Sequence, residues 1–278
     1  MARLSITTAW NEASAFVKQE AGPLFLISFG LMALPGIILQ VVAPQYLGGM
    51  DMAPGTAPNA QRALEMLPII GLMFIPILLL TTWGNLTIIM LALRRERVIG
   101  AAFVSAARRI LPLVGASLLV GLAAGLVIAP VFGLLFVNLR SGHLGLPGLL
   151  MLLAIVLILA VWIRLMLMTT VAAAEPVGPI AIIRRSWQLT AGHFWKLLGF
   201  MLLLMVVYFV VVLVVSALGG VVVVLLAGPP APGSLSSLAI QLILGVVQAV
   251  CLLYFIVLLA CIYRQLSGAA ESTAQVFN

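Results

Sequence analysis

Charged residues are scarce in this chain, and acidic ones are the scarcest. Of its 278 residues, 8% are charged and only seven are Asp or Glu, whereas 64% are hydrophobic. No acidic residue falls well inside a long apolar run, so the side chains that usually couple proton or cation movement, or act as general acids and bases, are lacking. This balance excludes a soluble domain and predicts a membrane protein that is not an enzyme.

Cysteine and histidine are nearly absent as well. Cys251 and Cys261 lie in the last apolar run, about three helical turns apart and on different sides of one helix, so they cannot bridge each other. His143 and His193 are expected at opposite membrane faces, and no zinc, nucleophile-elbow or Walker pattern occurs. We therefore expect no catalytic residues, no metal site and no cofactor.

Long apolar runs make up most of the chain. Each is long enough to cross a hydrocarbon layer of about 30 Å, which takes about 20 helical residues. We therefore predict an all-α polytopic bundle, a single membrane domain over residues 1–265, and a polar, disordered tail over residues 266–278. The six predicted spans are residues 24–42, 64–93, 112–138, 146–173, 194–227 and 238–263.

Three short segments with amphipathic spacing each precede a pair of spans. Residues 5–20, residues 99–109 and a helix beginning at Pro179 are predicted to lie on the membrane surface. Aligning Phe103 with Trp187 also superposes residues 113–115 on residues 197–199, and the first segment fits with one extra turn. The pattern predicts a threefold internal repeat of surface helix, span and return span.

Arginine and lysine flank the apolar runs and give the chain a net charge of +7. With six spans, only Arg62 and Arg140 fall on the side away from the chain ends. The bias predicts a multi-pass protein of the bacterial cytoplasmic (inner) membrane with both termini in the cytoplasm. Because no soluble domain presents these charges, nucleic-acid binding is not expected.

The span over residues 112–138 carries small residues at every fourth position. Such a ladder lets another helix approach closely, and we interpret it as the central packing seam of the bundle. The alternative is a chance run in a helix rich in Gly and Ala. The ladder consists of Ser117, Gly121, Gly125, Ala129 and Gly133.

Two polar residues stand out inside predicted spans. Arg164 lies about two turns from the cytoplasmic end of its span, and it either reaches the interface or pairs with Glu175 if the chain folds back. Asn85 lies with Thr81 and Thr82 near the middle of another span. Hydrogen bonds between helices are the first interpretation of such groups, and a transport pathway is the alternative.

Residues 175–199 combine basic and aromatic residues at a predicted helix start. The segment is either a positively flanked interfacial anchor or a site for an anionic lipid headgroup. Its predicted interfacial signature is Glu175, Gly178, Pro179, Trp187, Phe194 and Trp195. The predicted headgroup residues are Arg184, Arg185 and Lys196, with Arg108 and Arg109 from the earlier basic segment.

This segment resembles the signature of the glycerophosphoryl diester phosphodiesterase membrane domain family. The resemblance rests on a Glu-x-x-Gly-Pro turn followed by Arg-Ser-Trp-x-Leu-Thr-x-Gly-x-Phe-Trp, here residues 175–179 and 185–195. It implies a stand-alone bacterial membrane module without phosphodiesterase activity, since the longest predicted loop has only about 19 residues. We expect a protein that binds or organises anionic membrane lipids, or a membrane-protein partner; the alternative is a small-solute transporter or channel.

Overall fold

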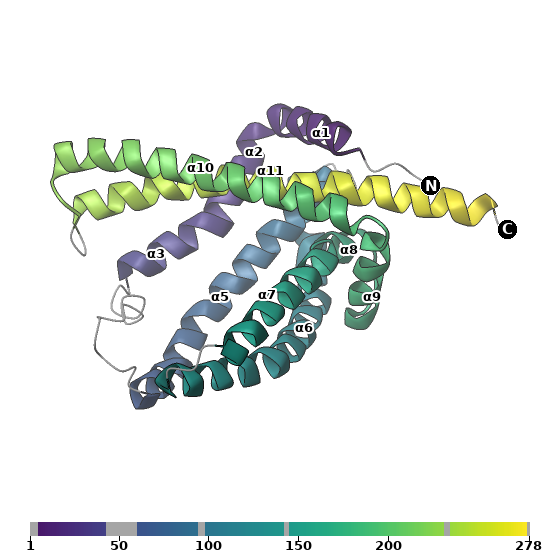
Figure 1. Ribbon diagram of the computed structural model, residues 1–278. Helices are drawn as coiled ribbons and strands as arrows, with labels where there is room; N and C mark the ends of the chain where they lie inside the picture. Colours follow the sequence, from purple (N-terminus) through teal and green to yellow (C-terminus); the bar gives the residue numbers. More distant parts are fainter. Residues whose placement is uncertain (1–4, 43–59, 94–97, 142–144, 231–233, 277–278) are drawn as a thin grey trace.

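The computed structural model describes residues 5–42, 60–93, 98–141, 145–230 and 234–276, which form helices and no strand (Figure 1). Six stretches are long and apolar enough to cross a membrane, which confirms the predicted all-α, six-span class. The helices are α1 (Ile6–Gln19), α2 (Ala21–Ser28), the π-helix η1 (Phe29–Ala33), α3 (Leu34–Val42), α5 (Ala60–Ala92), α6 (Ile99–Ser141), α7 (Gly145–Leu165), α8 (Met168–Ala174), α9 (Pro179–Thr190), α10 (Phe194–Ala227) and α11 (Leu235–Val276).

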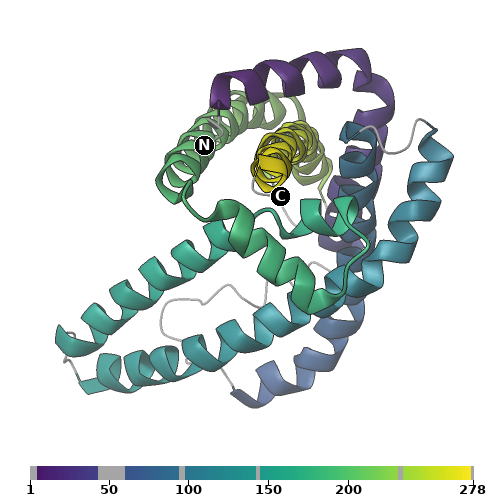
Figure 2. The same cartoon turned by 90° about the vertical axis from the view of Figure 1, so that its right-hand side faces the viewer.

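The core lies where the long helices converge, and it does not extend along their whole length. Figure 2 looks along α11, which runs through the middle of this packed end, with α1 on one side and α8 and α9 on the other. From there the α6–α7 and α10–α11 hairpins diverge (Figures 1 and 2). Their far parts expose large apolar side chains such as Leu126 and Leu225. Such surfaces are stable where lipid replaces water.

Each short helical segment that precedes a pair of spans packs on the helix that ends another pair. Helix α1 lies on α11, where the Trp10 ring stacks on Tyr254 with their centroids 6.1 Å apart. The start of α6 lies on α5, where the Trp83 Nε1–H donates to the Phe103 carbonyl at 2.8 Å. Helix α9 likewise contacts α7 and α8. The three segments thus share one packing rule, while the threefold repeat itself stays a prediction.

The boundaries differ from the prediction in several places. No break separates the predicted surface helix 99–109 from the next span, because α6 runs through both with Pro112 inside it. A membrane helix tolerates the lost N–H where its neighbours compensate. The predicted span 146–173 is divided into α7 and α8, and residues 266–276 of the predicted tail continue α11. Most of the predicted loop 43–61 lies outside the described residues.

Candidate functional site

An apolar cavity of about 770 Å³ lies among α5, α6, α7, α8, α9 and α11. Its wall consists mainly of aliphatic, aromatic and methionine side chains. Its lining residues with polar groups are Asn85 on α5, Trp162 on α7, Thr169 on α8 and Trp187 on α9. The volume falls within the roughly 300–1,000 Å³ of typical ligand pockets. The geometry therefore provides space for one apolar molecule with a few polar groups in its wall.

The Arg164 guanidinium adjoins this cavity through an aromatic neighbour. Its carbon ζ lies 5.2 Å from the centroid of the Trp187 ring and 5.8 Å from that of Phe194. A cation over an aromatic ring is attracted by the negative face of the ring. Because Trp187 also lines the cavity, the charge lies one aromatic ring away from the apolar space.

The backbone of Arg164 is anchored by hydroxyl groups of α9. The Ser186 hydroxyl donates to the Arg164 carbonyl at 2.9 Å, and Thr190 Oγ1 lies 3.3 Å from the same oxygen. This carbonyl belongs to the last turn of α7, where a helix leaves its carbonyls without partners. The Ser186 hydroxyl gives this carbonyl a partner and connects the α7–α8 break to α9, whereas the single Thr190 proton has a closer acceptor in the Ser186 carbonyl, at 3.0 Å. We name Ser186, Trp187, Thr190 and Phe194 the Arg164 cradle.

Glu175 pairs with Arg185 and Tyr263. Its Oε1 accepts from the Arg185 Nε–H at 3.1 Å and from the Tyr263 hydroxyl at 2.8 Å. The chain does fold back after α8, as a pair between Arg164 and Glu175 requires, but the structure gives Glu175 a partner on α9 instead. The carboxylate thus connects the end of α8 to α9 and α11, and Arg164 keeps its charge for other contacts.

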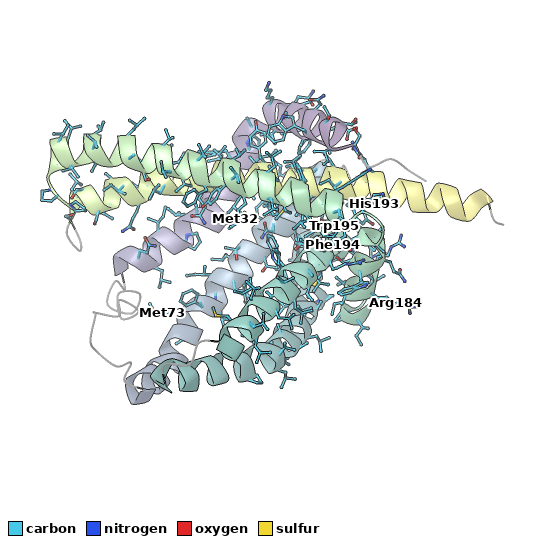
Figure 3. All side chains as sticks on the ribbon, viewed as in Figure 1. Met32, Met73, Arg184, His193, Phe194 and Trp195 are labelled. Carbon is cyan, nitrogen blue, oxygen red and sulfur yellow. The ribbon has the colours of Figure 1, made fainter. Side chains whose placement is uncertain are left out.

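The other predicted headgroup residues lie apart from the cradle. Arg109 donates to the Ala172 carbonyl at 3.1 Å, so its guanidinium contributes to packing. Arg108, Arg184 and Lys196 are exposed, and Figure 3 shows Arg184 pointing outward from α9. The role of these cations in headgroup binding stays a prediction.

The start and end of α9 explain part of the interfacial signature. Pro179 is the first residue of the helix, as predicted, and Gly178 is its N-cap. Gly192 has a φ of +83°, a left-handed conformation that favours glycine in the turn before α10. Trp195 is 80% exposed, which suits an interfacial position.

The face of α9 that packs on the protein is shifted from the predicted apolar stripe. The helical spacing of Ile180, Ile183 and Trp187 predicts one apolar stripe, yet Ile180 is 74% exposed. Ile182, Ser186 and Leu189, which lie outside this stripe, are buried. A membrane helix exposes apolar side chains to lipid, so hydrophobic spacing does not identify the protein-facing side. The i, i+4 spacing of Ser186 and Thr190 was the usable signal, since it places both hydroxyls on one face.

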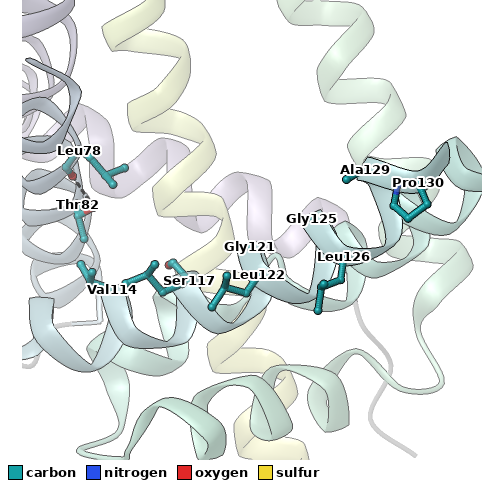
Figure 4. Close-up of a pocket in the computed structure, with 11 residues that line it drawn as sticks. Leu78, Thr82, Val114, Ser117, Gly121, Leu122, Gly125, Leu126, Ala129 and Pro130 are labelled. Carbon is teal, nitrogen blue, oxygen red and sulfur yellow. Dashed lines mark hydrogen bonds between the residues drawn. The ribbon is translucent and has the colours of Figure 1, made fainter. Parts of the chain in front are cut away.

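The predicted packing seam is an open groove. Ser117, Gly121, Gly125 and Ala129 line a hollow of about 720 Å³ between α5 and α6, together with Thr82 (Figure 4). All four are exposed, and a Cβ built on either glycine meets nothing within 4 Å. Gly133 is likewise open. The interpretation as the central seam was therefore wrong, because no described helix of this chain packs against the ladder.

The hydroxyl groups of α5 are used within their own helix. Thr81, Thr82 and Thr87 donate to carbonyls four residues earlier, at 2.9, 2.6 and 2.8 Å. The expected bonds between helices are therefore not the role of these residues. A bond of that kind occurs elsewhere, from the Ser28 hydroxyl to the Ala249 carbonyl at 2.8 Å.

Fold and site together define an all-helical protein with six membrane-length apolar helices and a partly open apolar cavity among them. The chain belongs to the family described as Domain of unknown function (DUF7847), which matches residues 20–266. Comparisons with curated proteins and with solved structures give no match. The resemblance to the glycerophosphoryl diester phosphodiesterase membrane domain stays a prediction.

Proposed function

We propose that this chain is a non-catalytic membrane protein that binds a lipid with an acyl chain in the cavity. The observation that carries the proposal is the cavity of about 770 Å³ with its apolar wall from six helices. An acyl chain is the ligand that suits such a wall, because it packs against the apolar side chains without leaving a polar group unpaired.

A hydrated solute fits the cavity less well. A transport path needs polar groups that replace the water around the solute. The wall offers polar groups only from Asn85, Thr169 and two indoles, those of Trp162 and Trp187. The hydroxyls of Thr81 and Thr82 bond their own helix. We therefore favour lipid binding over the alternative of a small-solute transporter or channel.

The proposed setting is the cytoplasmic membrane of a bacterium, with the packed end of the bundle on the cytoplasmic side. Basic residues of α1, α6 and α9 support this orientation under the positive-inside rule. The last turns of α11 pack beside α1, where Arg264 pairs with Glu12, so the two ends of the fold share one side. A reporter fused after Asn278 should be active only in the cytoplasm; activity on the other side would contradict this topology.

Native mass spectrometry of protein extracted with its lipids tests the cavity directly. Ala124 lines the cavity and Ala129 lines the groove on the same helix, so the variants Ala124→Trp and Ala129→Trp form a matched pair. We expect Ala124→Trp to lower lipid retention about tenfold, equivalent to roughly 1.4 kcal/mol. Ala129→Trp should retain lipid as the unchanged protein does. Equal retention by both variants, at equal melting temperature, would refute binding in the cavity.

A further inference from the structure

We infer that Arg164 binds the phosphate of the lipid whose acyl chain occupies the cavity. The inference rests on the proposed lipid binding and names the residue that selects the headgroup. Its basis is one juxtaposition: an arginine without a counterion, held by the cradle, beside an apolar cavity with which it shares Trp187.

The charge of Arg164 has aromatic neighbours and no acid. Among the described residues, its guanidinium makes no ion pair and donates no hydrogen bond, while Arg185 and Arg264 pair with Glu175 and Glu12. An arginine inside a membrane is costly unless something compensates its charge. Aromatic rings over the plane of a guanidinium leave the N–H groups at its edge available for an anion.

The depth of Arg164 matches the level of lipid phosphates. The 18 residues from Leu146 to Ile163 carry no charge and would rise about 27 Å as a helix. A hydrocarbon layer is about 30 Å thick, so a charge at residue 164 lies near its boundary when Leu146 lies at the opposite boundary. A lipid phosphate at that level can accept two parallel hydrogen bonds from the Arg164 guanidinium.

The position of Arg164 is fixed before any ligand arrives. The Ser186 hydroxyl donates to its carbonyl, and the rings of Trp187 and Phe194 lie beside its guanidinium. All four cradle residues come from one short segment, so α9 and the start of α10 position a single arginine. A preorganised donor loses less entropy on binding than a mobile surface side chain does.

The same lipid can reach both parts of the site. Leu165 and Met166 follow Arg164 in the chain and both line the cavity, as does Trp187 from α9. A phosphate at the guanidinium therefore places the attached acyl chains at the cavity wall. This arrangement favours a phospholipid with net negative charge over a zwitterionic one, because among the described residues no acidic side chain pairs with the guanidinium and could receive a headgroup cation.

Headgroup preference in nanodiscs tests the assignment. With equal amounts of phosphatidylglycerol and phosphatidylcholine of identical chains, native mass spectrometry should show about tenfold preference for the anionic lipid. Arg164→Gln should abolish the preference, and Arg164→Lys should keep part of it, because lysine retains the charge without the fork. Arg184→Gln, on the exposed side of α9, is the matched control and should keep the preference.

A wild-type measurement covers the case in which Arg164→Gln does not fold. Phosphatidic acid should be retained about tenfold better than diacylglycerol with the same chains. Equal retention would overturn the inference, and so would displacement of the lipid by millimolar inorganic phosphate, which would assign the site to a free anion.

The variants also separate the two proposals. If Ala124→Trp loses lipid but Arg164→Gln keeps the preference for phosphatidylglycerol, only the role of Arg164 is refuted. If Ala124→Trp retains lipid normally, the proposed lipid binding itself fails. A preference lost in Arg184→Gln as much as in Arg164→Gln would place headgroup selection in the surface charge and overturn the assignment to Arg164.

Discussion

Two apolar hollows of similar size lie on either side of α6, and they differ in what surrounds them. The groove of about 720 Å³ is lined by α5 and α6 alone, and the hydroxyls of Thr82 and Ser117 bond their own helix. The cavity of about 770 Å³ draws on six helices and adjoins the unpaired charge of Arg164. The two hollows thus differ less in volume than in the charge beside them, since Arg164 makes no ion pair among the described residues.

The largest expected effect is a loss of stability when a glycine that contacts another helix is enlarged, compared with a glycine that lines the groove. A Cβ on Gly115 would lie 3.2 Å from Pro179 Cγ, but one on Gly125 meets nothing within 4 Å. We expect Gly115→Leu to lower the free energy of unfolding by about 2 to 3 kcal/mol through overpacking of α6 on α9. Gly125→Leu should leave it unchanged or slightly higher, since leucine favours helix more than glycine does. Unfolding in detergent measures both.

A large loss of unfolding free energy in Gly125→Leu would contradict the view that the groove is open. It would mean that a second chain or another protein fills the groove, so that the ladder is a packing seam after all. Cross-linking of the unchanged protein in membranes would then identify the neighbour.

An intermediate effect on stability is expected when a hydroxyl of the cradle is removed, compared with a hydroxyl that lines the groove. Ser186→Ala removes a donor to the Arg164 carbonyl, and we expect a loss of about 1 to 2 kcal/mol in unfolding free energy because a buried acceptor loses a partner. Thr190 limits the loss, since its Oγ1 lies 3.3 Å from the same oxygen. Ser117→Ala, on the groove side, should change stability by less than about 0.5 kcal/mol. Similar losses in both variants would show that the cradle does not anchor α7.

The smallest expected effect concerns the exposed cations that the sequence had suggested for headgroup binding. Arg184→Ala combined with Lys196→Ala should change retention of phosphatidylglycerol by less than about twofold, because exposed charges interact weakly in water and salt. Native mass spectrometry at two salt concentrations measures it. A tenfold loss of phosphatidylglycerol retention would indicate that these exposed cations bind the headgroup.

The sequence predicted the spans well because their signal is local. Each apolar run is set by the thickness of the membrane, so length and composition suffice to find it. The helix start at Pro179 was equally local, since proline suits the first helical position. The break between α7 and α8 was missed because the apolar residues 165–168 continue the run through it. The Arg164 carbonyl meets the Ser186 hydroxyl only when α9 folds back against it.

The spacing of the small residues did not predict whether their face of the helix packs on another helix or stays open. Gly121 and Gly125 have the pattern of a close helix contact, yet they face the groove. In a soluble protein the hydrophobic effect would identify the buried side, but lipid is as apolar as the protein interior, so that signal is absent. The same physics explains why the apolar stripe of α9 did not identify its protein-facing side.

By itself the sequence determined that the chain forms six membrane-length apolar helices, that its charges flank them, and that Arg164 is an isolated charge near a span end. Only the tertiary structure showed that Ser186, Trp187, Thr190 and Phe194 gather around that arginine, and that Glu175 is already paired with Arg185. The four cradle residues lie more than 20 positions after Arg164, so they meet it only when the chain turns back at α8 and α9. Hydrophobicity sets which segments enter the membrane, whereas hydrogen bonds and packing between helices decide which polar groups meet there.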